Sequence, residues 1–220
     1  LKIFIFYSIL SLIYFTLLNI SGVRLFNSLN LTMTLVSNGG FLPSDSLNDI
    51  IISNFQKIIL IFALIFSFLN FYFLFNIFNR RALFKSHKED FYLITFATFF
   101  VLLIYFNDFE ALDIIISVLS SLTNSGITLL ETNNNLSLYF LLLTIVGGSL
   151  ISNTSGIKLS RFYILLKITA AEIIKLISPN SIINKTIFSS ENKINEDNVK
   201  ISFLIFISFF FSLFILSSFL

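Results

Sequence analysis

The chain has 220 residues, of which 56% are hydrophobic and 12% are charged, and its formal net charge is +2. Soluble globular domains carry about 25% charged residues, so this composition, with a mean hydropathy of +0.92, predicts an integral membrane protein. The chain has no cysteine and a single histidine, which argues against thiolate metal sites and Cys-based or metal-dependent catalysis, and it has no charge run suggestive of nucleic acid.

Five apolar stretches approach the length of about 20 residues that a spanning helix needs. In chain order they are 1–20, 58–78, 91–107, the broken stretch 136–151 with 162–177, and 201–220. The first stretch is longer than the hydrophobic part of a usual signal peptide, and no small-x-small cleavage site follows it. We therefore favour a retained span over a cleaved signal.

Two shorter, semi-polar segments, 23–36 and 110–122, lie between these stretches. As helices they would reach about 20 Å, less than the hydrocarbon core of about 30 Å. A polar, glycine-bearing loop follows each one, and such backbone is tolerated at membrane depth only inside protein or beside a wet cavity. The pattern predicts two re-entrant pore helices, with surface amphipathic helices or plain loops as the alternative.

The two glycine loops have the chemistry of a cation selectivity filter. Backbone carbonyls can replace the hydration shell of an ion, and glycine allows both positive φ and close approach of backbones. A preceding half-helix would direct its partly negative C-terminal end at the ion. We predict K⁺ binding through backbone carbonyls, with no covalent cofactor. The predicted filter residues are Val36, Ser37, Asn38, Gly39, Thr123, Asn124, Ser125 and Gly126.

The order of span, half-span, glycine loop and span occurs twice, which predicts an internal repeat. Gly39 and Gly126 lie 87 residues apart, and aligning them places Ser37-Asn38-Gly39 on Asn124-Ser125-Gly126. The predicted units are a repeat at 1–78, a linker at 79–90, a repeat with a broken second helix at 91–177, a linker at 178–200, and a helix at 201–220.

Charge predicts the orientation of the chain. Loops on the side of the glycine loops carry Asp45, Asp49, Asp108, Glu110, Asp113 and Glu131. The two linkers carry most of the Lys and Arg residues, which makes them cytoplasmic by the positive-inside rule. Arg24 and Lys57 run mildly against this pattern. We expect a multi-pass protein of the plasma (inner) membrane.

A third polar stretch interrupts the second helix of the second repeat. Its Gly-Gly pair and the run 152–156 disfavour a helix, and a mobile loop at this depth could act as a gate. The cationic residues that follow would raise a barrier on an ion path, or would snorkel to the interface. The predicted gate-loop residues are Gly147, Gly148, Ser152, Asn153, Thr154, Ser155, Gly156, Lys158 and Arg161.

The stretches 26–41, 120–126 and 147–161 together resemble the membrane subunit of Trk/Ktr-type potassium transporters, and the third is the most specific. The resemblance implies an all-α membrane fold of four M1–pore helix–M2 units, of which this chain would hold the second, the third and the first helix of the fourth. It also implies partners: the missing units of the same subunit, membrane lipid, a homodimer of full-length subunits, and a cytosolic nucleotide-binding regulatory subunit. The chain departs from the family at Asn38, at 123–127, and at Ile151 and Ser155, where the family has further glycines.

The sequence therefore predicts potassium uptake through a carbonyl-lined filter that an intramembrane loop gates. Na⁺ or mixed Na⁺/K⁺ transport is the alternative within this class. A non-conducting membrane scaffold, or a degenerate transporter fragment, is the alternative from another class. An intramembrane enzyme is disfavoured, because it would need a paired nucleophile and base, or several carboxylates, inside the spans, and the sequence offers one clear intramembrane acid, Glu172.

Overall fold

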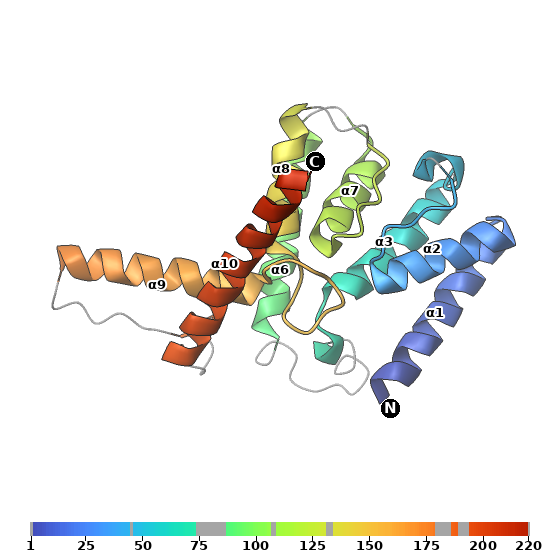
Figure 1. Ribbon diagram of the computed structural model, residues 1–220. Helices are drawn as coiled ribbons and strands as arrows, with labels where there is room; N and C mark the ends of the chain where they lie inside the picture. Colours follow the sequence, from blue (N-terminus) through green and yellow to red (C-terminus); the bar gives the residue numbers. More distant parts are fainter. Residues whose placement is uncertain are drawn as a thin grey trace.

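The computed structural model describes residues 2–44, 46–73, 87–106, 109–130, 134–178, 186–188 and 194–219, and these residues form helices and irregular connections without an extended strand. The predicted all-α class is confirmed (Figure 1). The helices are α1 (Lys2–Ile20), α2 (Leu25–Ser37), a short 3₁₀ turn η1 (Leu47–Asp49), α3 (Asn54–Phe68), α6 (Lys88–Tyr105), α7 (Ala111–Thr123), α8 (Asn134–Val146), α9 (Leu159–Ile177) and α10 (Glu196–Phe219). Most of both predicted linkers lies outside the described residues.

The first six of these α-helices form two groups of three in chain order. Helices α1, α2 and α3 contact one another, and α7 contacts both α6 and α8. The half-helices α2 and α7 have 13 residues each. Their offset is 86 residues, since residue 25 corresponds to 111 and residue 37 to 123. The predicted 87-residue spacing is therefore wrong by one position.

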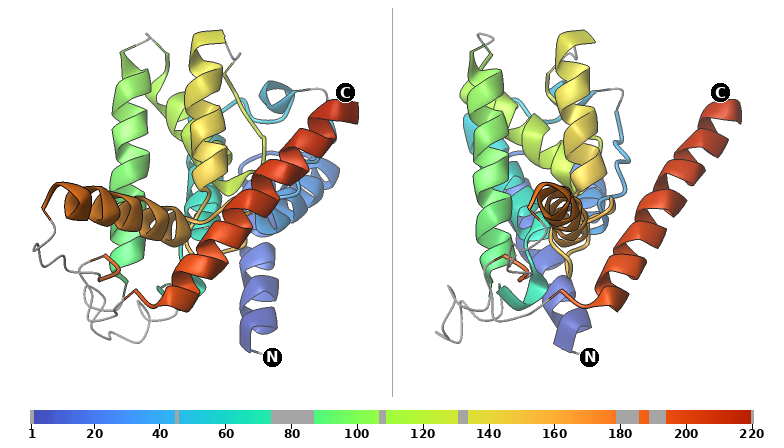
Figure 2. Two further views of the ribbon diagram at one scale, coloured as in Figure 1. Left: turned by 60° about the vertical axis from the view of Figure 1, so that its left-hand side comes forward. Right: turned by 90° about the vertical axis from the view of Figure 1, so that its left-hand side faces the viewer.

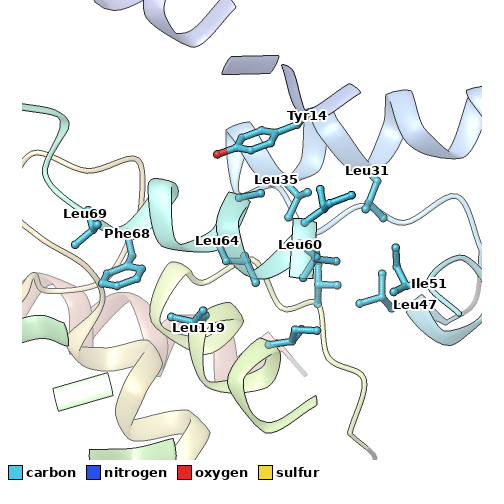
Figure 3. Close-up of a cluster of buried hydrophobic side chains, with 14 of the residues drawn as sticks. Tyr14, Leu31, Leu35, Leu47, Ile51, Leu60, Leu64, Phe68, Leu69 and Leu119 are labelled. Carbon is cyan, nitrogen blue, oxygen red and sulfur yellow. The ribbon is translucent and has the colours of Figure 1, made fainter. Parts of the chain in front are cut away.

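The two groups are joined by the packing of α3 against α7, the most extensive contact between any two of the described helices. Figure 3 shows Leu60 and Leu64 of α3 between Leu35 of α2 and Leu119 of α7 in one buried cluster. Because lipid tails are as apolar as leucine, close packing rather than exclusion of water holds such a cluster together in a membrane.

The outer faces of the helices carry large apolar side chains. Phe4, Phe62 and Phe99 are between 55% and 73% exposed, and faces of this kind are stable against lipid rather than water. α10 is the one described helix that is long and apolar enough to cross a membrane by itself. Figure 2 shows it standing away from the bundle, while α9 projects across the direction of α6 and α8.

The predicted unbroken span over 58–78 is wrong. α3 begins earlier, at Asn54, behind a capping box in which Ser53 and Gln56 satisfy each other's backbone N–H groups. It ends at Phe68, and helical backbone resumes over 71–73. Contacts from the loop between α8 and α9 explain this interruption, as described below.

Candidate functional site

The half-helices α2 and α7 end in the same backbone conformation. Asn38 has φ 54° and ψ 34°, and Asn124 has φ 59° and ψ 25°. Both are left-handed, a region that asparagine tolerates better than most residues. Two positions later each loop has a glycine with positive φ, 72° at Gly40 and 68° at Gly126. The two loops therefore repeat one turn, residue for residue.

This geometry changes the repeat register inferred from the sequence. Gly39 corresponds to Ser125, and both donate their N–H to the carbonyl five residues earlier, over 3.2 and 3.1 Å. The structural partner of Gly126 is Gly40, which the sequence-based filter set leaves out. A signal was present in the sequence, because Gly40 and Gly126 each stand directly before a large apolar residue.

The two glycine loops touch each other. A Cβ atom placed on Gly40 would lie 2.5 Å from the carbonyl oxygen of Ser125, so only glycine allows this approach. Ser125 is itself 2% exposed. The C-terminal ends of α2 and α7 thus converge on one place, where two stretches of backbone lie side by side.

The helices that follow the two loops, α3 and α8, hold both asparagine side chains in place. Ser67 Oγ of α3 donates to Asn38 Oδ1 over 2.8 Å. Asn124 Nδ2 donates to the carbonyl oxygen of Thr144 in α8 over 3.2 Å. In each group, therefore, the third helix is tied to the turn that ends the half-helix.

Buried hydroxyl groups support the second loop from behind. The Ser125 hydroxyl lies 3.1 Å from the hydroxyls of both Ser120 and Thr123, and all three residues are buried. In the first loop Thr34 Oγ1 donates to the carbonyl oxygen of Phe41 over 2.5 Å. These bonds fix the shape of both loops, and in the second loop they give partners to hydroxyl groups that would be costly to bury unpaired.

A third irregular segment, the 147–158 loop, separates α8 from α9 and docks on the broken end of α3. Ser149 N donates to the carbonyl oxygen of Phe68 over 3.1 Å, and Phe71 N donates to that of Ile151 over 2.9 Å. A carbonyl at the end of α3 and an N–H beyond its break thus find partners in this loop. The loop replaces the hydrogen bonds that a continuous helix would have made.

Two carboxylates at the start of α6 complete this docking. Asp90 Oδ1 accepts the N–H of Asn70 over 2.8 Å, and Glu89 Oε1 accepts that of Leu150 over 2.9 Å. Both lie in the predicted 79–90 linker, before the apolar stretch 91–107. Burial raises the pKa of Glu89 to about 7.

The glycines of the 147–158 loop permit its tight folding. Gly147 has φ 68°, and a Cβ there would lie 2.3 Å from the Ser155 carbonyl oxygen. A Cβ on Gly148 would lie 2.9 Å from the carbonyl oxygen of Phe68. Larger residues would push the loop off the end of α3.

The structure brings some of the predicted gate residues to the first glycine loop. Asn153 Nδ2 donates to the carbonyl oxygen of Val36, in the last turn of α2, over 2.8 Å. Val36, Ser67 and Asn153 also line a small cavity beside α1. Lys158 turns back into the 147–158 loop, whereas Arg161 lies half-buried in the first turn of α9.

At the opposite end of the interface between α3 and α7, Lys57 is paired with two carboxylates. Its Nζ lies 2.5 Å from Asp113 Oδ1 and 3.0 Å from Glu110 Oε2. Lys57 is 11% exposed, while Glu110 is 72% exposed. Lys57, one of the two cations that ran against the predicted charge pattern, therefore holds the start of α7 to α3.

No family model matches the chain. Over 182 residues it is 29% identical to a protein of Methanocaldococcus jannaschii described as an uncharacterized cation transporter, covering 81% of this chain and 37% of that protein. Among solved structures, the potassium transporter TrkH from Vibrio parahaemolyticus matches with a TM-score of 0.81 and 17% sequence identity, over 94% of this chain and 47% of that one. The chain spans less than half the length of both proteins. It has the fold of part of a membrane-embedded transporter subunit, and the resemblance to Trk/Ktr-type subunits is confirmed at the level of the fold.

Proposed function

We propose that this chain is part of a K⁺ uptake protein in which two pore-loop units line one ion path. The observation that carries the proposal is the contact of the two glycine loops at Gly40 and Ser125. Each loop ends a half-helix too short to span a bilayer, and helix C-termini carry partial negative charge that favours a cation. The likeness to a potassium transporter and to a cation transporter supports the same reading.

In this proposal the filter carbonyls come from residues 36–40 and 123–126. The 86-residue register adds Gly40 to the set inferred from the sequence and makes it the counterpart of Gly126. Two loops supply half of a four-part ring, so the other half belongs to units outside this chain. The ion passes by exchange of its water for carbonyl oxygen, and no covalent chemistry or covalent cofactor is involved.

The 147–158 loop is the proposed gate. Asn153 bonds to the Val36 carbonyl, one of the groups that a cation would otherwise approach at the end of α2. Transport would require this contact to open or to move. The loop also binds the broken end of α3, so its motion is linked to the helix that holds Asn38.

The division into units follows from the same reading. Residues 1–78 form the second unit and residues 91–177 the third, with 201–220 as the first helix of the fourth. The linkers 79–90 and 178–200 face the cytoplasm, where a nucleotide-binding regulatory subunit would dock on a homodimer of full-length subunits in the plasma (inner) membrane.

The proposal is tested by ⁸⁶Rb⁺ uptake in K⁺-uptake-deficient cells that express the full-length parent protein. We expect Gly40→Ser and Gly126→Ser to abolish uptake or to admit Na⁺, and Gly39→Ser to transport close to the wild-type rate. Competition by K⁺ and by Na⁺ distinguishes the two selectivities. Wild-type protein that reaches the membrane but takes up no Rb⁺ would instead favour the non-conducting scaffold.

A further inference from the structure

The ammonium group of Lys158 is held by four oxygen atoms of its own loop. Its Nζ contacts the hydroxyl and the carbonyl of Thr154, the hydroxyl at 3.0 Å, and the hydroxyl and carbonyl of Ser152 at 3.2 and 3.4 Å. We call these four oxygens the oxygen cage. Lys158 is 9% exposed, so the charge is removed from solvent.

No carboxylate forms an ion pair with Lys158 among the residues that the structure describes. A buried ammonium is ordinarily paired with an acid. Here its hydrogen-bond partners are four neutral oxygens, and carbonyl-lined sites hold a K⁺ ion in the same way. The ligand set is thus that of a monovalent cation site.

Hydrogen bonds within the loop orient the cage oxygens toward a cation. The Ser152 hydroxyl donates to the carbonyl oxygen of Ser149 over 2.7 Å, so its lone pairs are left for other partners. Thr154 Oγ1 lies 2.8 Å from Ser152 Oγ and accepts the N–H of Gly148 over 3.1 Å. With the Thr154 hydrogen directed at Ser152, both hydroxyls present lone pairs to the ammonium.

The backbone of Lys158 is strained in order to place its side chain there. Its φ of 78° is positive and its ψ is 135°, a combination that a residue with a side chain adopts only at a cost. Glycine at this position would be free of this strain. The contacts of the ammonium with the oxygen cage offset that cost.

We infer that the 147–158 loop is a monovalent-cation site whose resident occupant is the tethered ammonium of Lys158. The lysine fills the oxygen cage and keeps the loop folded on the end of α3, and a K⁺ ion that enters the cage must displace it. This inference rests on the proposed function for the identity of the competing ion.

Removal of the side chain should vacate the oxygen cage for a free ion. Lys158→Gly suits the positive φ and leaves the four oxygens without their cation, while Lys158→Met removes the charge but keeps an apolar chain of similar length in place. We expect purified full-length Lys158→Gly protein to bind one more ⁸⁶Rb⁺ per chain than the wild type, and Lys158→Met to bind no more. Equal Rb⁺ binding by the Gly variant and the wild type, or an equal gain in both variants, overturns the inference.

A second measurement uses the wild-type protein and does not depend on the folding of a variant. Displacement of the ammonium by K⁺ would expose the amine, so K⁺ should accelerate acetylation of Lys158 several-fold over tetramethylammonium at equal ionic strength. Lys175, whose side chain is 42% exposed, serves as the internal control, with equal rates in both salts. A Lys158 rate that does not respond to K⁺ refutes the displacement. Wild-type Rb⁺ flux, measured on the same preparation, tests the proposed transport separately from both binding results.

Discussion

Alanine substitutions at the three glycines of the two glycine loops should cost stability in a fixed order. At Gly40 an added methyl meets positive φ and lies 2.5 Å from a backbone oxygen. The left-handed conformation costs about 1–2 kcal/mol, and overpacking costs about 1–3 kcal/mol more, so Gly40→Ala should lose about 2–5 kcal/mol. At Gly126 the φ is 68°, but no atom lies within 4 Å of the new methyl, so only the first cost applies.

Gly39 is the matched control for this series. It lacks positive φ, and its new methyl would meet the side-chain hydroxyl of Ser37 at 3.1 Å, a group that can rotate away. Gly39→Ala should therefore change stability by less than about 1 kcal/mol. Thermal unfolding of the full-length protein in detergent, with ⁸⁶Rb⁺ flux on the same samples, measures the order. The 86-residue register is refuted if Gly39→Ala proves as damaging as Gly40→Ala.

Three further predictions concern contacts around the two loops. Lys57→Met should lower the free energy of unfolding by about 2–4 kcal/mol, because it leaves a partly buried carboxylate without its cation. Glu110→Gln should lower it by less than about 1 kcal/mol. Equal shifts of the melting temperature in the two variants would contradict this. In urea unfolding, wild-type stability should fall as pH rises from 4.5 to about 7, since the folded Glu89 carboxyl keeps a proton that the unfolded one releases. Glu89 contributes at most about 3 kcal/mol to this fall, and Glu89→Gln should remove that part and leave the part that comes from the buried Asp90; a variant with an unchanged pH profile would argue against this burial. Asn153→Leu removes the hydrogen bond, worth about 1 kcal/mol, that holds the proposed gate closed on the Val36 carbonyl. Rb⁺ flux should therefore rise about fivefold with selectivity unchanged. A lower flux at equal abundance would count against the gate.

Local sequence features were enough to find the half-helices. The predicted segments 23–36 and 110–122 became α2 (Leu25–Ser37) and α7 (Ala111–Thr123), because length between polar loops is a local property. The register of the repeat was harder, since glycine identity alone favoured Gly39. What the backbone requires is a glycine with positive φ two positions after the left-handed asparagine, and in the first loop this position is Gly40.

The interruption of α3 could not be read from its own residues. The stretch 58–78 is apolar and contains neither glycine nor proline, so it predicts a continuous helix. Its break is stabilised from outside, by Ser149 at Phe68 and by the Asp90 carboxylate at Asn70. Such contacts join residues that are 20 or more positions apart, and no periodicity reports them.

These contacts join the first glycine loop, α3 and the 147–158 loop in one hydrogen-bonded system. The broken end of α3 binds the loop, α3 also holds Asn38 through Ser67, and Asn153 returns from the loop to the end of α2. A displacement of the loop therefore removes a partner from α3 and from the Val36 carbonyl together. Because each lost backbone partner inside a membrane costs several kcal/mol, the loop should move between discrete, fully bonded arrangements rather than drift. Opening of the proposed gate should therefore alter the proposed filter in the same step.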